Sequence, residues 1–182
     1  MESFVPQDRV YEAINTREID PLSLLDNLGL SATYYFAREY EQSRQQANRA
    51  LEIDPKYPQA IEQVEGVDEV TGEYKRAIEQ RIKLAQALGD RRGAEEVRQV
   101  FEKSGYQGYL RKDAKDKEAG GDYYGSAEDY ALLGAKDAAF VALERAAAEG
   151  QALDNFKLDP ALDSLRSDPR YADLLRRVGL PQ

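Results

Sequence analysis

The chain reads Glu18-Ile19-Asp20-Pro21 near its start and Glu52-Ile53-Asp54-Pro55 thirty-four positions later. A second marker has the same spacing, because Arg38-Glu39-Tyr40 is followed by Gly72-Glu73-Tyr74. Two independent markers with one period indicate an internal repeat, in which each unit supplies one supersecondary element. A chain of 182 residues has room for several such units around a continuous core.

The period and the pattern inside each unit resemble the tetratricopeptide repeat, a pair of antiparallel helices. Units of that family have a small residue at position eight, an aromatic at eleven, a turn near fifteen and a second small residue at twenty. The matching residues are, in the first unit, Ser31, Tyr34, Arg38 and Ser43; in the second, Gly72, Tyr74 and Ala77; in the third, Ala94, Val97, Phe101 and Gly105; in the fourth, Ala127, Tyr130, Gly134, Ala139, Leu143 and Ala146. The second unit departs from the pattern with Glu65 and Asp68 at positions eight and eleven.

The resemblance implies an all-α fold, a right-handed α-solenoid of about four units with a C-terminal helical cap. Small residues let paired helices approach closely, and a neighbouring aromatic such as Tyr34, Tyr74 or Tyr130 is expected to fill the core between them. Glycine at the turn supplies the positive φ that ends a helix, and Asp-Pro marks a helix start.

A single domain spanning residues 1–182 is expected. The repeat divides it into an opening segment, four units and a capping segment. An opening helix at 7–17 lies in residues 1–20, the units are 21–55, 56–89, 90–119 and 120–150, and a capping segment covers 151–182. The predicted helix pairs are 22–37 and 40–53, 57–70 and 73–88, 91–103 and 106–118, and 122–133 and 136–149.

The ending, from Phe156-Lys157-Leu158-Asp159-Pro160 onward, resembles the segment that closes tetratricopeptide arrays in bacterial signalling proteins. That resemblance implies a sensory or scaffolding role. A solenoid needs a cap because its last unit has no neighbour, and the expected cap residues are Leu162, Leu165, Leu174, Leu175 and Val178. Two readings remain open for Arg166, Arg170, Arg176 and Arg177, which either belong to the cap or bind a partner.

Composition excludes several classes of function. The chain has no Cys and no His, which removes disulfides, zinc fingers, cysteine nucleophiles and Ser-His-Asp triads. Its formal net charge is −9, so direct nucleic-acid binding is not expected. No nucleophile–base set, phosphate loop or Asp-rich metal loop is visible, and we expect no enzymatic activity, no metal and no cofactor. Without a signal peptide or a long apolar run, a cytoplasmic protein without membrane insertion is expected.

In the tetratricopeptide family, defined positions of the first helices line a concave groove that binds partners. Transferring those positions gives a groove with an apolar end and an acidic middle. The predicted groove residues are Leu25, Leu28, Tyr35 and Phe36 in the first unit, Glu62 and Glu69 in the second, Glu95, Gln99 and Glu102 in the third, and Tyr124 and Glu128 in the fourth. An acidic groove favours a basic or neutral protein segment.

Protein–protein interaction through this groove is the function that the sequence predicts. The alternative is a self-assembling effector or sensor module of a bacterial signalling or transcription-regulating protein. Phe4, Val5, Val10 and Ile14 of the opening helix are the candidates for a homodimer interface, because this helix belongs to a repeat whose first helix is missing.

Overall fold

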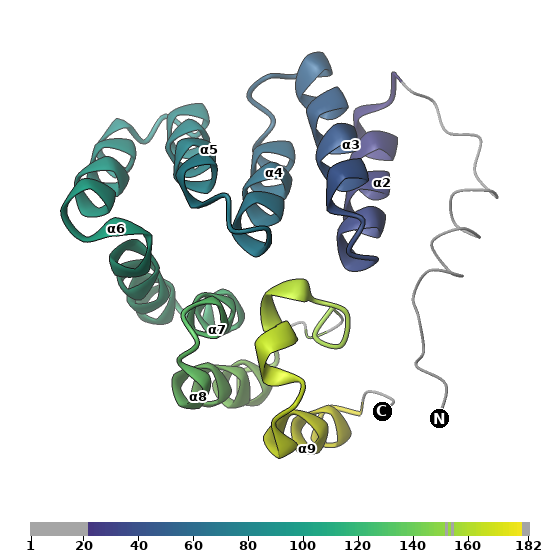
Figure 1. The fold of residues 1–182 in the computed structure, drawn as a ribbon, viewed down its shortest axis with the longest axis vertical. Coiled ribbons are helices and arrows are strands. Elements are labelled where there is room, and N and C mark those ends of the chain that lie inside the picture. The colour runs from purple at the N-terminus through teal and green to yellow at the C-terminus, as the bar shows by residue number, and fades with distance from the viewer. Residues whose placement is uncertain (1–21, 152, 154, 180–182) are drawn as a thin grey trace. The chain divides into compact units, whose positions relative to one another are not determined.

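The computed structural model describes residues 22–151, 153 and 155–179, and every regular element in this part of the chain is helical (Figure 1). The elements are α2 (Leu24–Phe36), α3 (Tyr40–Ile53), α4 (Pro58–Val70), α5 (Tyr74–Ala87), α6 (Arg91–Gly120), α7 (Tyr123–Leu132), α8 (Lys136–Ala148), the 3-10 helix η1 (Pro160–Leu165) and α9 (Pro169–Arg177). The all-α class is therefore confirmed for the described residues. The predicted opening helix and its dimer candidates lie outside them.

The helix bounds repeat with the period found in the sequence. Helix α4 begins and ends 34 residues after α2, and α5 begins and ends 34 residues after α3. All the predicted helix ends of these two pairs, and of α7 and α8, lie within two residues of the observed ends. The marker at Arg38-Glu39-Tyr40 and Gly72-Glu73-Tyr74 therefore identifies equivalent points of two successive helix pairs.

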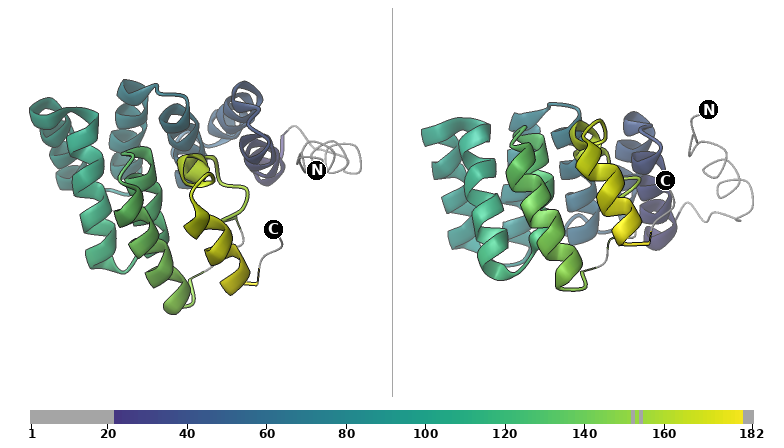
Figure 2. Two further views of the ribbon diagram at one scale, coloured as in Figure 1. Left: turned by 60° about the horizontal axis from the view of Figure 1, so that its bottom comes forward. Right: turned by 90° about the horizontal axis from the view of Figure 1, so that it is seen from below.

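The chain forms two compact units, one ending at Gln99 and the other beginning at Val100. In the first unit α2 packs on α3, α3 on α4 and α4 on α5, and α2 also contacts α4. In the second unit α7 packs on α8 and on η1, and α8 contacts α9 (Figure 2). The boundary falls inside α6, in the predicted third repeat.

All four predicted turn positions have positive φ: 64° at Arg38, 78° at Gly72, 65° at Gly105 and 73° at Gly134. Arg38 is the one non-glycine residue among the described residues with this conformation, and its Nη1 donates to the carbonyl of Phe36 at 2.6 Å. Gly105 combines its φ with a ψ of −173°, a conformation that essentially only glycine adopts, and it separates two helical stretches of α6.

Small buried residues lie where paired helices meet. Ser31 and Ser43 are fully buried, and each hydroxyl donates to the backbone carbonyl of the other residue, at 2.7 and 2.9 Å. Ala127 and Ala139 occupy the equivalent positions of the fourth repeat and are also fully buried. The predicted small-residue joints are therefore confirmed in the first and fourth repeats.

The aromatic positions follow the prediction only in part. Tyr34 and Tyr130 are partly buried, and Tyr130 packs against the core of the second unit. Tyr74 is 48% exposed, so its prediction as a core residue is wrong. It is the first residue of α5, and its ring lies beside the turn at Gly72, at the end of the helix.

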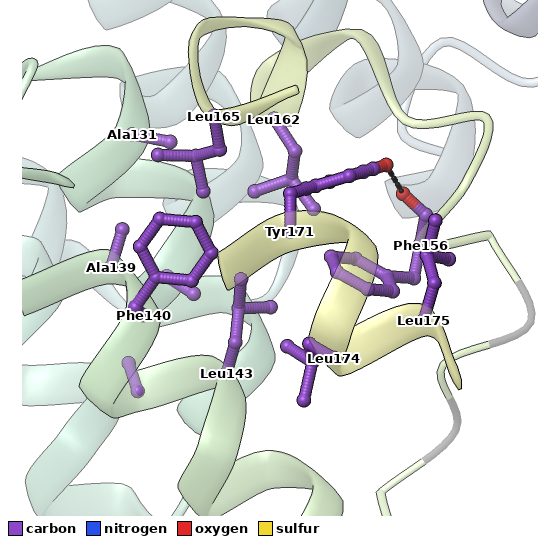
Figure 3. Packing of buried hydrophobic residues seen from close by; sticks show 12 residues of the cluster. Ala131, Ala139, Phe140, Leu143, Phe156, Leu162, Leu165, Tyr171, Leu174 and Leu175 are labelled. Carbon is purple, nitrogen blue, oxygen red and sulfur yellow. Dashed lines mark hydrogen bonds between the residues drawn. The ribbon is translucent and has the colours of Figure 1, made fainter. Parts of the chain in front are cut away.

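The closing segment, residues 151–179, covers the last helix pair. Leu162, Leu165, Leu174 and Leu175 are buried, as the sequence predicts, in a cluster with Ala131, Ala139, Phe140 and Leu143 (Figure 3). Two members that the closing segment contributes, Phe156 and Tyr171, were not predicted from the sequence. Their rings lie 4.7 Å apart, and the Tyr171 hydroxyl donates to the carbonyl of Phe156 at 2.8 Å.

Replacing either Ala77 or Ala139 with Trp should overpack a helix joint, because the two alanines are 1% and 0% exposed. We expect a loss of about 1–3 kcal/mol or more in the free energy of unfolding, measured by denaturant titration. Ala148→Trp, at an exposed position of α8, is the control and should cost only a few tenths of a kcal/mol. Equal stability of all three variants would contradict the helix pairing described above.

Candidate functional site

The predicted groove residues all lie on α2, α4, α6 and α7, the first helices of their repeats. They fall into two sets, because the chain divides at Gln99. The first unit contains Leu25, Leu28, Tyr35, Phe36, Glu62, Glu69, Glu95 and Gln99, and the second contains Glu102, Tyr124 and Glu128.

The apolar residues of α2 extend from an exposed leucine to an aromatic cluster. Leu25 is 70% exposed, whereas Leu28 packs against the core that α3 and α4 form. The Tyr35 ring lies 5.6 Å from Phe36 and 6.2 Å from Tyr40 in edge-on contacts. Its other side faces Gly66 of α4, where a Cβ atom would lie 3.8 Å from the ring. The tyrosine ring therefore packs beside the first helix of the next repeat.

The acidic residues differ in how far their charge is compensated. Glu62 is exposed and Glu69 is half-buried, and the two lie seven residues apart on one side of α4. Glu95 of α6 forms an ion pair with Arg98 and accepts a hydrogen bond of 3.0 Å from Gln99. Because the negative charge of Glu95 is compensated within its own helix, the exposed Glu62 of α4 contributes most to the acidic character of this surface in the first unit.

Glu65 and Asp68, the departures from the repeat pattern, are buried ion-pair partners in the first unit. Asp68 is fully buried and pairs with Arg44 of α3 and, at 3.5 Å, with Arg76 of α5. The Nε of Arg81 lies 2.7 Å from Oε1 of Glu65. Burial raises the pKa of Asp68, and the two arginines oppose that shift. These carboxylates connect three successive helices, which is a structural role.

Asp129 of α7 has a comparable role in the second unit. Nζ of Lys117 lies 2.9 Å from both of its carboxylate oxygens, and the same ammonium lies 3.0 Å from Asp113. The charged C-terminal stretch of α6 is thereby joined to α7.

The α7 face that carries Tyr124 and Glu128 is in contact with the chain's own closing segment. The Gln151 side chain accepts from the backbone N–H of Tyr124 at 2.9 Å and donates to the carbonyl of Gly121. The Tyr124 hydroxyl donates to Asp159. Further along α7, the Ser164 hydroxyl donates to the carbonyl of Ala131 at 3.1 Å. The predicted groove positions of α7 therefore already have a peptide segment as a neighbour.

The arginines of the closing segment are paired within the chain. Arg170 bonds Asp168 at 2.9 Å and Asp137 at 2.8 Å, and its guanidinium lies 4.3 Å from the centre of the Phe140 ring. Hydrogen bonds from Arg170 lower the pKa of Asp168 to about 2. The remaining pairs are Arg166 with Asp163 and the carbonyls of Lys157 and Asp159, Arg176 with Asp173, and Arg177 with Glu144 and Asp173. These contacts favour the interpretation that the four arginines belong to the cap over the alternative that they bind a partner.

Within residues 22–179 as described, no three acidic side chains are grouped so as to hold a metal ion. None of the helices described there combines the length and the apolar character needed to cross a membrane. No protein-family model and no curated protein matches the chain.

Removing Arg44 should leave the buried Asp68 carboxylate with only its longer contact to Arg76. We expect Arg44→Ala to lower the free energy of unfolding by about 3–5 kcal/mol, because an uncompensated buried charge is costly. Arg49→Ala, on the exposed side of α3, is the matched control.

The double variant Arg44→Met with Asp68→Leu should recover most of that loss, since both charges are then absent. Denaturant unfolding of the four proteins provides the comparison. An Arg44→Ala variant as stable as Arg49→Ala would show that the ion pair is not needed to compensate Asp68.

Proposed function

We propose that the chain is a right-handed tetratricopeptide-type solenoid of about four repeats that acts as a protein-binding scaffold without enzymatic activity. The observation that carries this proposal is the placement of apolar and acidic residues on two helices in mutual contact. Exposed Leu25 and the aromatic pair Tyr35 and Phe36 lie on α2, and Glu62 and Glu69 lie on α4. Aromatic and aliphatic anchors beside charged groups are the composition that protein interfaces use.

The partner that this surface fits is a protein segment with an apolar residue next to Lys or Arg. Leu25 and the aromatic pair offer contacts to the apolar residue, and the α4 carboxylates attract the basic one. With a net charge of −9, the chain as a whole also favours a basic partner over nucleic acid. We place this interaction in the cytoplasm, in keeping with the resemblance to signalling proteins.

A self-assembling effector or sensor module is the second candidate function. Leu22 and Leu25 are 80% and 70% exposed at the start of α2, the end of the described chain that follows the predicted opening helix. Exposed leucines of this kind favour association. Sedimentation of the pure chain over a range of concentrations separates a dimer from a monomeric scaffold.

Reversing the charge of α4 tests the scaffold proposal. We expect Glu62→Lys with Glu69→Lys to lose the basic partners that the wild type retains from native lysate at low salt. A synthetic peptide made from the retained partner's segment should bind at least tenfold more weakly to this variant. Glu52→Lys with Glu79→Lys, at exposed positions of α3 and α5, adds the same charge on the second helices and should bind like the wild type.

As a control, circular dichroism should show the same helix content in both variants as in the wild type. Identical partner sets for wild type and the α4 variant, with binding insensitive to salt, would exclude α4 as the recognition surface.

A further inference from the structure

The ring of Tyr35 is held in place on the surface that α2 and α4 share. Phe36 and Tyr40 contact it edge-on, with ring centres 5.6 and 6.2 Å away. On the α4 side, its Cε2, Cζ and Oη atoms lie 3.8–3.9 Å from the place of a Cβ atom on Gly66. The phenol end of the ring therefore lies against α4, and Tyr35 stays partly exposed.

Glu62 lies one turn before Gly66 on the same face of α4. Four residues of helix correspond to a rise of about 6 Å, which is within the length of a glutamate or arginine side chain. Glu62 is exposed to solvent. Its carboxylate and the Tyr35 ring can therefore be contacted by one side chain of a partner.

The residues that adjoin the ring on this surface are small. Ala32 lies three residues before Tyr35 on α2, and Gly66 lies opposite on α4. Neither has a side chain beyond Cβ, so neither can cover the ring or the Glu62 carboxylate. This part of the surface can accept a long side chain without rearrangement of the helices.

The charges around the ring favour the Glu62 side for a partner's cation. Arg38 follows the C-terminal end of α2, and its Nη1 donates to the carbonyl of Phe36 at 2.6 Å. Glu69 lies in the last turn of α4, whereas Glu62 lies in the first half of that helix. The positive charge that the chain itself supplies is thus at the ends of the helices, away from Glu62.

A ring beside a carboxylate distinguishes arginine from lysine. The guanidinium group is planar, so it can stack on an aromatic ring while two of its N–H groups donate to a carboxylate. The lysine ammonium is a compact and strongly hydrated charge that gains less from the ring.

We propose that Tyr35 and Glu62 form a recognition site for an arginine side chain of the partner. This inference rests on the proposed function, which treats arginine and lysine alike, and it makes arginine the preferred residue. Leu25 and Phe36 remain for the partner's apolar residue.

Binding of three short peptides to the full chain tests the proposal. They are acetylated pentapeptide amides, Leu-Ser-Xaa-Ser-Leu, in which Xaa is arginine, lysine or citrulline, the neutral analogue of arginine. Titration followed by NMR gives the dissociation constant and identifies the amides that the peptide shifts. The arginine peptide should shift amides of α2 and α4 and bind about threefold more tightly than the lysine peptide. The citrulline peptide should bind about tenfold more weakly, because it has no charge.

Matched variants assign the preference to the two side chains. Tyr35→Leu keeps an apolar side chain without the ring and should bind the arginine and lysine peptides equally, whereas Tyr35→Phe should keep the preference. Glu62→Gln should weaken both charged peptides, and its exposed position preserves the test if Tyr35→Leu does not fold. Glu52→Gln, exposed on α3, should behave like the wild type.

Equal binding of the arginine and lysine peptides by the wild type would overturn the arginine site and leave the basic partner of the proposed function standing. An arginine preference that survives in Tyr35→Leu would also overturn it, as would arginine-peptide binding that Glu62→Gln does not weaken. No binding of the arginine peptide, or shifts confined to other helices, would do the same. The charge reversal of α4 in native lysate decides the proposed function separately.

Discussion

The close approach of paired helices at small residues is the constraint on which the rest of the structure depends. Ser31 and Ser43 face each other twelve residues apart, and their hydroxyls satisfy each other's backbone carbonyls inside the joint. Ala127 and Ala139 meet the same requirement with no side chain beyond Cβ. Once each pair closes in this way, α4 and α5 recur 34 residues after α2 and α3, and the last pair needs a cover.

The second repeat shows how this constraint tolerates charge. Glu65 stands where Ser31 and Ala127 stand in the other repeats, and it is buried, as is Ala77 at the position equivalent to Ser43. Its carboxylate is satisfied by Arg81, while Asp68 one turn later is held by Arg44 and Arg76. Such pairs contribute little net stability, but each is costly to break, and they fix which helices become neighbours.

Local patterns predicted the helix ends, the turns at Arg38 and Gly105 and the small buried residues, because these depend on neighbours within one unit. The ion-pair partners could not be predicted in the same way. Arg44 and Asp68 are 24 residues apart in the sequence, and Tyr124 and Asp159 are 35 residues apart. At such separations the spacing of two residues does not indicate whether they are in contact. The groove positions were transferred from the family on the assumption that this face of every unit is exposed to solvent. They could therefore not indicate that the closing segment lies on α7. The division of the chain into two compact units inside α6 could also not be predicted from local sequence patterns.

A disulfide across the first joint tests the helix pairing most directly, since the natural chain has no Cys. The Oγ atoms of Ser31 and Ser43 lie 3.2 Å apart, so Ser31→Cys with Ser43→Cys should form an intramolecular disulfide when refolded in a thiol–disulfide buffer. Ser31→Cys with Asn48→Cys, on the exposed side of α3, should keep both thiols. Thiol titration with unchanged helical circular dichroism is the measurement. Free thiols in the first variant, or equal oxidation of both, would contradict the close approach of these helices.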